Sequence, residues 1–470
     1  MTSEPSESPA NAALRELAEL AGIAAHDSAA VEIAGDDPVF PTAYRVGAAG
    51  AAALAATGLA ASELWALRTG RRQRVAVDLR AAAASLRSTH YLRIDGKPPP
   101  PPWDPVSGFY PTRGGGWVQL HCNFPHHRDR ALEVLGATPD RGAIEEASRR
   151  WDGEALEEAV IAAGGCTGLV RSADLWACHP QALAVASLPL LEIRRIGDAP
   201  PEPLPPGDRP LSGIRVLDLT RVLAGPTCAR TLAEHGADVL KITAAHLPDS
   251  GAVELDTGLG KLSARLDLRE TGALGTLRDL LREADVFSQS YRPGALAARG
   301  LAPEDLAALR PGIICVTLSA WGHTGPWRDR RGFDTIVQSV SGMAAGSGDG
   351  RKPRHLPVSA IDYVSGYLMA FGTMIALARR TREGGSWLVR ASLARTGLWV
   401  VERGRVAAAL RDVPPDLPAQ EIARLTAETM SPAGVIRHLR PVVELSETPP
   451  RWERPPVPLG FHRPEWPPRA

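Results

Sequence analysis

The sequence has few aromatic residues, few cysteines and no excess of charge of either sign. Phe, Trp and Tyr make up 5% of its 470 residues, so a folded core must rely on Ala, Leu and Val. The 53 Lys and Arg residues balance the 53 Asp and Glu residues, which removes the electrostatic basis for binding nucleic acid. No CxxC motif is present and the cysteine count is odd, so we expect neither a disulfide framework nor a metal site. The cysteines are Cys122, Cys166, Cys178, Cys228 and Cys315.

Long hydrophobic runs are also missing, and we expect no secretory leader. The N-terminus, MTSEPSESPANAAL, is acidic and polar, unlike a signal peptide. The longest uncharged stretch, residues 46–62, is mostly Ala and Gly and is shorter than a membrane span. We therefore expect a cytoplasmic protein that has neither a membrane nor nucleic acid among its partners.

Glycine and proline are abundant instead, with 45 and 42 residues. Prolines fill positions 98–102 and recur through residues 199–210, and both stretches predict breaks between packed segments. These breaks suggest a division of the chain into four parts. The parts are a lead over 1–38 that is helical in places, a segment over 39–205, a segment over 210–400 and a tail over 401–470.

Residues 210–400 alternate short apolar runs with helical patterns. Pro226 suits the first turn of the first helix of this segment, and Gly236 suits its end. Strand–helix–strand units of this kind predict α/β structure with a doubly wound parallel sheet. The first turn reads TRVLAGP and lacks GxGxxG, so nothing in it indicates a dinucleotide. The expected strands are 214–220, 237–242, 264–268, 284–290 and 312–318.

The same segment carries six motifs in the order and spacing of the class III CoA-transferases, and the chain resembles that family over about 210–400. This family contains formyl-CoA and carnitine CoA-transferases and is grouped with the α-methylacyl-CoA racemases. The resemblance implies a Rossmann-like large domain, a smaller α/β domain and two chains threaded through each other as interlocked rings. The motifs are LSGIRVLDLTRVLAGPTCARTLAEHGADVLKI, GKLSARLDL, ADVFSQSYRPGAL, VTLSAWGHTGPW, RRGFDTIVQSVSG and the helix headed by Asp362.

The family's segments stand in an altered order here. GFYPTRGGGWVQLHCNF and GLVRSADLWACHPQALA resemble small-domain segments but precede the Rossmann half, so 39–205 is interpreted as a downstream-type half. Residues 362–393 also resemble residues 43–79, each an Ala-rich helix followed by a strand, although similar composition alone is an alternative explanation. Asp362 heads the later copy, whereas Ala43 stands in the earlier one. We therefore predict one active site per chain.

Asp362 is the predicted nucleophile. The resemblance implies that its carboxylate attacks an acyl-CoA thioester, and that the released CoA converts the resulting anhydride into an aspartyl-CoA thioester. An incoming carboxylic acid then reverses the sequence. Asp334 matches a second acidic position of the family and is assigned an auxiliary role in orienting the site or handling protons. Judged on neighbouring residues alone, Asp362 fits a helix N-cap and Asp334 fits a surface carboxylate equally well.

The resemblance also assigns residues to CoA, which is expected as a substrate, with no permanently bound cofactor. Two of these residues are arginines, which suit the pyrophosphate and the 3′-phosphate of CoA. The predicted CoA-binding residues are Val222, Leu223, Ala224, Leu266, Arg269, Tyr291 and Arg292.

Several positions depart from the family pattern. Thr243 and Ala244 stand where relatives have an acidic residue and, in some members, an arginine. Gly258 and Leu259 replace polar or basic residues, although Lys261 remains. These changes weaken the expected CoA contacts and keep open a catalytically silent CoA-binding paralogue.

Three functions therefore remain open at this level. The first is CoA transfer between an acyl-CoA and a carboxylic acid. The second is an acyl-CoA racemase or isomerase, which Phe333 disfavours because the racemase branch has a proton-transferring histidine there. The third is the silent paralogue. His323 is interpreted as a loop donor, and we expect assembly as a homodimer or a hetero-oligomer.

Overall fold

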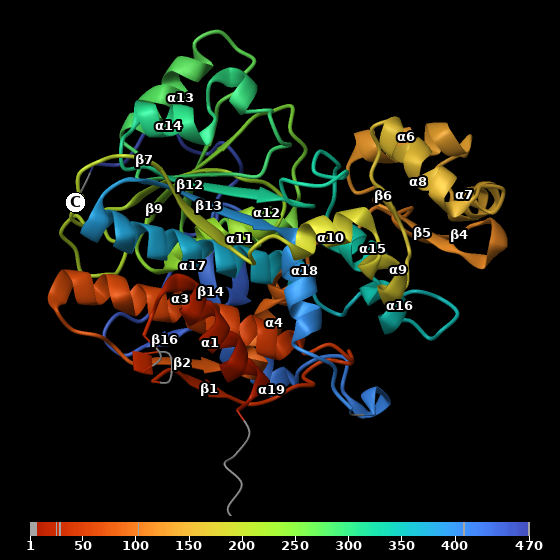
Figure 1. Ribbon diagram of the computed structural model, residues 1–470, viewed down its shortest axis with the longest axis horizontal. Coiled ribbons are helices and arrows are strands. Elements are labelled where there is room, and N and C mark those ends of the chain that lie inside the picture. Colours follow the sequence, from red (N-terminus) through yellow and green to blue (C-terminus); the bar gives the residue numbers. More distant parts are fainter. Residues whose placement is uncertain (1–6, 25, 28–29, 102, 408, 469–470) are drawn as a thin grey trace, which may run out of the picture.

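A computed structural model describes residues 7–24, 26–27, 30–101, 103–407 and 409–468, which form a layered body with a lobe beside it (Figure 1). Residues 98–101 of the expected proline break lie in neither helix nor strand, and Pro102 lies outside the described residues. Parts of the expected lead, residues 1–6, 25 and 28–29, also lie outside them.

A seven-stranded sheet forms the centre of the body. Its order is β10-β9-β8-β11-β12-β13-β7, and all pairs are parallel except β13 with β7. The chain leaves β8 toward one edge through β9 and β10, and toward the other through β11, β12 and β13. The predicted doubly wound parallel sheet is thus confirmed, with its topological switch between β8 and β11. The strands are β8 (Arg215–Leu219), β9 (Asp238–Thr243), β10 (Lys261–Arg265), β11 (Val286–Gln289), β12 (Ile314–Ser319), β13 (Ser386–Ser392) and β7 (Glu192–Gly197).

Helices cover both faces of this sheet, as Figure 1 shows. Helices α13 (Ala273–Arg282) and α14 (Pro303–Leu309) lie on one face, and α11 (Ala224–Glu234) and α17 (Ala360–Glu383) lie on the other. Every residue of β8 is buried as a result. This double burial explains why the strands appear in the sequence as continuous apolar runs rather than alternating ones.

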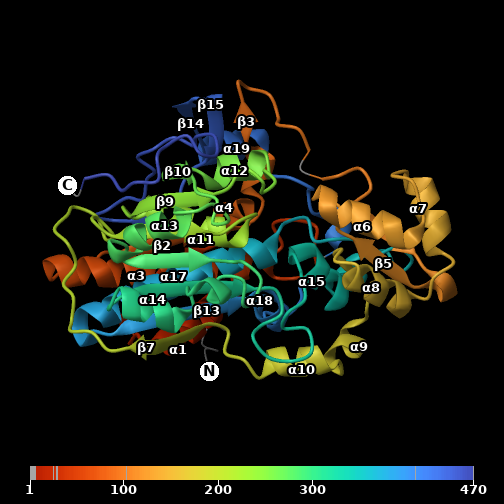
Figure 2. The same cartoon turned by 90° about the horizontal axis from the view of Figure 1, so that it is seen from above.

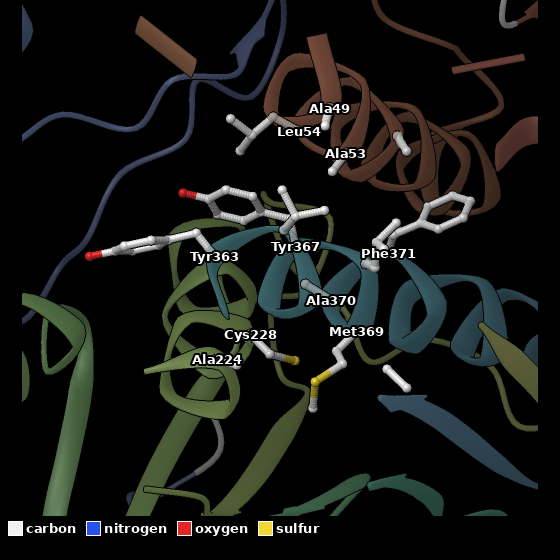
Figure 3. Close-up of a cluster of buried hydrophobic side chains, with 14 of the residues drawn as sticks. Ala49, Ala53, Leu54, Ala224, Cys228, Tyr363, Tyr367, Met369, Ala370 and Phe371 are labelled. Atoms are coloured by element: carbon white, nitrogen blue, oxygen red, sulfur yellow. The ribbon is translucent and has the colours of Figure 1, made fainter. Parts of the chain in front are cut away.

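A second long helix, α3 (Val46–Thr69), packs on the outer side of α17. Figure 3 shows Ala49 and Ala53 of α3 facing α17, with α11 on the opposite side. A Cβ atom added at Gly366 would lie 2.6 Å from the carbonyl oxygen of Ala224, so glycine is required where α17 crosses α11. By length and composition α3 and α17 are apolar enough to span a membrane, but 89% and 100% of their apolar windows are buried in this core.

The two long helices open similar units. Helix α3 is followed by β2 (Val75–Asp78) and α4 (Leu79–Ser85), and α17 is followed by β13 and α18 (Leu393–Glu402). In both units the last strand residue caps the next helix: the Asp78 carboxylate accepts the N–H of Ala81, and the Ser392 hydroxyl accepts that of Arg395. The structure thus has a helix, a strand and a capped helix at both places where the sequence suggested a repeat.

The lobe corresponds to the smaller α/β domain expected from the sequence. Its antiparallel sheet consists of β4 (Gly108–Pro111), β5 (Trp117–Leu120) and β6 (Thr167–Leu169). Helices α6 (Pro125–Leu135), α7 (Arg141–Ser148) and α8 (Gly153–Ala162) pack with this sheet around a core of their own. Figures 1 and 2 show the lobe at one side of the body, next to α15 (Asp334–Val340).

The sheets cross the boundaries suggested by the proline-rich breaks. Strand β7 lies in the segment 39–205 but pairs with β13 of the main sheet. The tail contributes β16 (Glu444–Leu445) to a sheet with β1 (Glu32–Ala34) and β2, and it contributes β14 (Thr426–Ser431) and β15 (Gly434–Leu439) to a sheet with β3 (Arg93–Ile94). The two halves and the tail are therefore interleaved. The remaining helices are α1 (Pro9–Ala21), α5 (Ser88–Tyr91), α9 (Ala173–Ala177), α10 (Pro180–Ala186), α12 (Ala252–Thr257), α16 (Met343–Ser347) and α19 (Ala419–Leu425).

Candidate active site

A cavity of about 340 Å³ opens at the carboxyl ends of the parallel strands. Residues that follow β8, β11 and β12 line it, namely 221–224, 290–293 and 320. Open α/β sheets bind ligands at this edge, where the order of the strands reverses. The fold therefore places this cavity where its topology favours a ligand.

Asp362 reaches this cavity from the first turn of α17. It is the third residue of the helix, and Ser359 occupies the N-cap position without a side-chain capping bond. The alternative that Asp362 is only an N-cap is therefore excluded. Its side chain is 8% exposed, and within the described part of the chain no hydrogen bond to its carboxyl oxygens is found. The positive end of the α17 dipole favours its ionised form.

Asp334 supplies the missing cap. Its Oδ2 accepts the backbone N–H of Asp362 at 3.0 Å, and its Oδ1 accepts a hydrogen bond from Nε2 of Gln338. The Oε1 of Gln338 in turn accepts the N–H of Leu356 at 2.8 Å. Asp334 is 4% exposed, so it is not a surface carboxylate. This network fixes the backbone of the first turn of α17 and therefore the direction of Asp362.

Burial changes the acidity of both carboxyls. Desolvation raises the pKa of Asp334 to about 6, although its hydrogen bonds oppose the rise. Desolvation raises the pKa of Asp362 well above its ordinary value, and the charge of Asp334 raises it further. Asp334 thus ionises first. Once ionised, Asp362 is a poorly hydrated and strongly basic carboxylate, which favours nucleophilic attack.

Five of the seven predicted CoA residues line the cavity together with Asp362: Val222, Leu223, Ala224, Tyr291 and Arg292. They follow the two central strands, and their common place confirms that the structure brings these segments together. Whether they contact CoA stays a prediction.

Val222 has a strained backbone. Its φ of 69° lies in the left-handed region, which a β-branched residue rarely adopts. The strain lies in the turn between β8 and α11, where the backbone borders the cavity. Strained backbone is concentrated at functional sites, so this observation favours a binding role for the turn.

Three other residues that matched the family lie outside the cavity lining. Leu266 packs against the apolar core on the other face of the sheet, and the exposed Arg269 pairs with Asp267 at 2.6 Å. Lys261 is 2% exposed and its Nζ lies 3.0 Å from the carboxylate of Asp218. Lys261 therefore stabilises the sheet. The exposed His323 also lies outside the cavity lining.

The cavity carries arginines that sequence reasoning missed. Arg221, Arg328, Arg330 and Arg331 line it along with Arg292. Arg330 pairs with Glu158 and Arg328 with Asp329, but among the described residues no acidic partner of the other three is found. Burial and the nearby charge of Arg292 lower the pKa of Arg331. A ligand with several phosphates would supply the missing negative charge.

The lobe closes the cavity with aromatic rings. Phe124, His126 and His127, at the beginning of α6, line it opposite the loops of the main sheet. Phe333 also lines it, and its ring stacks on that of His121 with centroids 3.9 Å apart. The N-terminal half thus completes a site whose predicted nucleophile belongs to the C-terminal half. No local motif indicates such a contact across about two hundred residues of chain.

Asp362 has a structural counterpart in α3. The third residue of that helix is Ala48, whereas Ala43 of the expected alignment precedes the helix, which begins at Val46. The register of the repeat therefore differs from the expected one, but alanine again stands where α17 has Asp362.

Comparison with known proteins finds relatives of this chain among the CoA-transferases. Residues 211–421 match CoA-transferase family III. The chain is 34% identical over 211 residues to the acetyl-coenzyme A transferase nodX of Hypoxylon pulicicidum, and the match covers 43% of this chain and 35% of that protein. It is 28% identical over 412 residues to an acyl-CoA transferase of Gibberella moniliformis, and that match covers 77% of this chain and 72% of the relative. The crystal structure of a CAIB/BAIF family protein from Brucella suis matches with 29% sequence identity and a TM-score of 0.39, and the match covers 42% of this chain and 56% of that one.

The resemblance found in the sequence is thus confirmed for residues 211–421. The chain spans about a third to a half of the length of many of the curated relatives it matches. The Gibberella match, which covers 77% of this chain, is longer than that segment and includes part of the remainder.

Proposed function

We propose that this chain, whose residues 211–421 match CoA-transferase family III, moves coenzyme A between an acyl-CoA and a carboxylic acid through a thioester on Asp362. One observation carries the proposal. Asp362 is a buried carboxyl at the positive end of a long helix, and it borders a cavity rich in arginine. A second carboxylate binds its backbone N–H, and among the described residues no hydrogen bond to its own oxygens is found.

The proposed reaction uses only carboxylates and thiolates. A carboxylate oxygen of Asp362 attacks the thioester carbonyl carbon, and the C–S bond breaks to release CoA thiolate and leave a mixed anhydride. The thiolate then attacks the Asp362 carbonyl of the anhydride, which forms aspartyl-CoA and releases the donor acid. An acceptor carboxylate attacks the carbonyl carbon of aspartyl-CoA, and the C–S bond breaks to release CoA thiolate and leave a second mixed anhydride. The thiolate then attacks the acyl carbon of the acceptor, which forms the new acyl-CoA and breaks the bond to the Asp362 oxygen. Asp362 is regenerated as a carboxylate.

Asp334 acts as a positioning residue in this scheme. It accepts the N–H of Asp362 and so fixes the turn that carries the nucleophile. Its charge also raises the pKa of Asp362, which makes the ionised nucleophile more basic but delays its ionisation as the pH rises. The unpaired arginines near the cavity offset the second negative charge when both carboxyls are ionised.

Substrate binding follows from the charges around the cavity. Arg221, Arg292 and Arg331 are proposed to hold the phosphates of CoA, because none of them has an acidic partner in the described part of the chain. We propose an acyl-CoA and a carboxylic acid as substrates, no permanently bound cofactor and a cytoplasmic location. Assembly as a homodimer or a hetero-oligomer is part of the proposal. Within one chain, residues of the lobe already line this cavity.

Trapping the covalent intermediate tests the proposal. The protein is incubated with a panel of acyl-CoAs, treated with hydroxylamine or borohydride, and digested for mass spectrometry. We expect modification at Asp362 in the wild type and in Asp279→Asn, which changes an exposed aspartate of α13. We expect none in Asp362→Asn. Absence of any adduct at Asp362 across the panel overturns the proposal.

Two further measurements, α-proton exchange in deuterated water and binding of CoA, separate the two alternatives. Exchange of the α-proton in deuterated water without an adduct identifies a racemase or isomerase. Binding of CoA without adduct or exchange identifies a silent paralogue. We expect no exchange, because the Phe333 ring stands where a base would be needed and stacks on His121.

A further inference from the structure

We infer that His127 is a further catalytic residue, whose imidazole donates a hydrogen bond to the carbonyl oxygen that becomes negative when Asp362 attacks the thioester. The inference rests on the proposed function and adds to it a residue from the lobe. No motif of the sequence marked this histidine.

The first observation is its place. His127 is the third residue of α6 and is 5% exposed, yet its side chain borders the same cavity as Asp362. Its ring lies 5.9 Å from that of Phe333, and the next residue, Asp334, binds the backbone N–H of Asp362. His127 and Asp362 therefore border one space, which the thioester must enter for the attack to occur.

The second observation is an unmet hydrogen bond. The Nδ1 of His127 is buried without a partner, and among the described residues no hydrogen bond of its Nε2 is found either. A buried polar group without a partner is unfavourable, so most such groups in folded proteins are paired. The oxygen of a bound substrate would satisfy this imidazole.

The third observation is its protonation state. Burial lowers the pKa of His127 to about 3, and electrostatic interactions with His126, His121, Arg331 and Arg221 contribute to the same effect. The ring is thus neutral at physiological pH, with one N–H donor and one acceptor nitrogen. A neutral donor in a cationic environment suits an oxygen that gains negative charge.

The step balances without proton transfer. The carboxylate of Asp362 forms a C–O bond to the thioester carbon, and the carbonyl π electrons move to oxygen. The His127 N–H stabilises that oxyanion by a hydrogen bond. The oxyanion then collapses, the carbonyl re-forms and the C–S bond breaks, releasing CoA thiolate.

The two neighbouring histidines do not fit this role. His126 lines the cavity but is exposed, and burial together with the nearby charges of Arg331 and Arg221 lowers its pKa. His121 is stacked against Phe333 and does not border the cavity. His127 is buried and borders the cavity, and among the described residues no hydrogen bond of its ring is found.

Three variants of the full-length chain test the inference. His127→Phe keeps a ring but has no donor, whereas His127→Gln keeps a donor. His323→Phe makes the same exchange at an exposed histidine outside the cavity. For each protein, the single-turnover rate of adduct formation at Asp362 is measured with an acyl-CoA, together with the Kd of CoA.

We expect His127→Phe to slow adduct formation about 10²-fold to 10³-fold, as the loss of one oxyanion donor does, with the Kd of CoA unchanged. His127→Gln should recover part of the rate, and His323→Phe should equal the wild type. The pH profile should show no limb that belongs to His127, because its ring stays neutral from pH 5 to 8.

Equal rates in the wild type and His127→Phe overturn the inference while leaving the proposed function intact. Absence of an adduct in the wild type overturns the proposed function first. If His127→Phe no longer binds CoA or its circular dichroism spectrum differs from that of the wild type, His127→Gln and His127→Leu are compared instead, because one keeps a donor and the other has none. Equal rates in that pair overturn the inference.

Discussion

Helices α3 and α17 are both 24 residues long, almost wholly buried and followed by a strand and a capped helix. Neither has a capping side chain at its own N-cap. In each, a carboxylate from another segment accepts backbone N–H groups of the second and third residues: Asp37 binds Gly47 and Ala48, and Asp334 binds Ile361 and Asp362. The two helix starts are therefore built alike.

The difference lies at the third position of the helix. Asp362 of α17 borders a cavity with arginines, whereas Ala48 of α3 is 1% exposed and borders no part of that cavity. The comparison separates two roles of a carboxylate. One carboxylate starts the helix in both copies, and a second one, present only in α17, is available for chemistry.

The largest expected effect comes from giving the third position of α17 the alanine that α3 has there. Asp362→Ala should lower CoA transfer by roughly 10⁴-fold or more, because the nucleophile is lost. The free energy of unfolding should be retained, since in the described part of the chain this carboxyl has no hydrogen bond to lose. Steady-state transfer rates and urea unfolding check both statements. Retained transfer would show that the reaction does not depend on Asp362.

The reverse exchange, which places an aspartate in α3, should destabilise the fold and should not create a second active site. Ala48→Asp places a carboxyl in the packed contact between α3 and the core, with no cavity to receive it. We expect a loss of roughly 3–5 kcal/mol in the free energy of unfolding, as for an uncompensated buried charge. Ala48→Ser is the matched small change. An adduct at position 48 would contradict this difference between the helices.

The arginines that line the cavity together with Asp362 have the next effect. Arg331→Gln should weaken CoA binding about 10-fold to 100-fold, because a charge-assisted hydrogen bond to phosphate is lost. Isothermal titration calorimetry with CoA measures the change, and the exposed Arg351→Gln is the control. Unchanged affinity would mean that the phosphates lie elsewhere, for example near Arg269.

A smaller effect concerns pH. The charge of Asp334 raises the pKa of Asp362, and transfer requires ionised Asp362, so the rate should rise with pH through that pKa. Asp334→Asn removes the charge and keeps an acceptor oxygen for the helix start. The pKa of Asp362 should fall, and the rising limb of the pH–rate profile should move to lower pH. A limb that stays in place or moves upward contradicts this coupling.

The smallest effect is at the corresponding cap of α3. Asp37→Ala removes the acceptor of the Gly47 and Ala48 N–H groups and should cost about 1 kcal/mol of the free energy of unfolding. Transfer rates should stay the same, because Asp37 is not among the cavity residues. Asp279→Ala, on the exposed face of α13, is the control for removing a carboxylate.

Much of the sheet could be predicted because its strands are buried on both faces. The runs at 214–220 and 312–318 fall on β8 and β12 within one or two residues. The strand expected at 264–268 begins earlier, at Lys261. Lys261 and Ser263 are polar, and they are buried because Lys261 pairs with Asp218 and Ser263 bonds to residues of the tail. Such partners are distant in the chain, so an apolar run alone does not include these positions.

The candidate site was predictable in part for the same reason. Asp362 and the turn at 222–224 belong to motifs of contiguous residues, so they could be found without a structure. His127 belongs to no such motif, and Arg331 belongs to one, RRGFDTIVQSVSG, in which nothing local indicates a cavity-lining role. Their role depends on the approach of α6 to the loop after β12, which joins segments about two hundred residues apart.

Local patterning is thus sufficient for the parallel sheet, because each strand is a run of neighbouring residues, whereas Asp362 was predicted as the nucleophile from motifs that resemble a known family. Only the tertiary structure shows that Asp334 caps the N-terminus of α17 and that Asp37 caps that of α3. It also shows that the lobe, from the N-terminal half, lines the cavity of the C-terminal half. These features depend on hydrogen bonds and packing between distant segments. The same contacts remove water from Asp362, and desolvation is what raises its pKa.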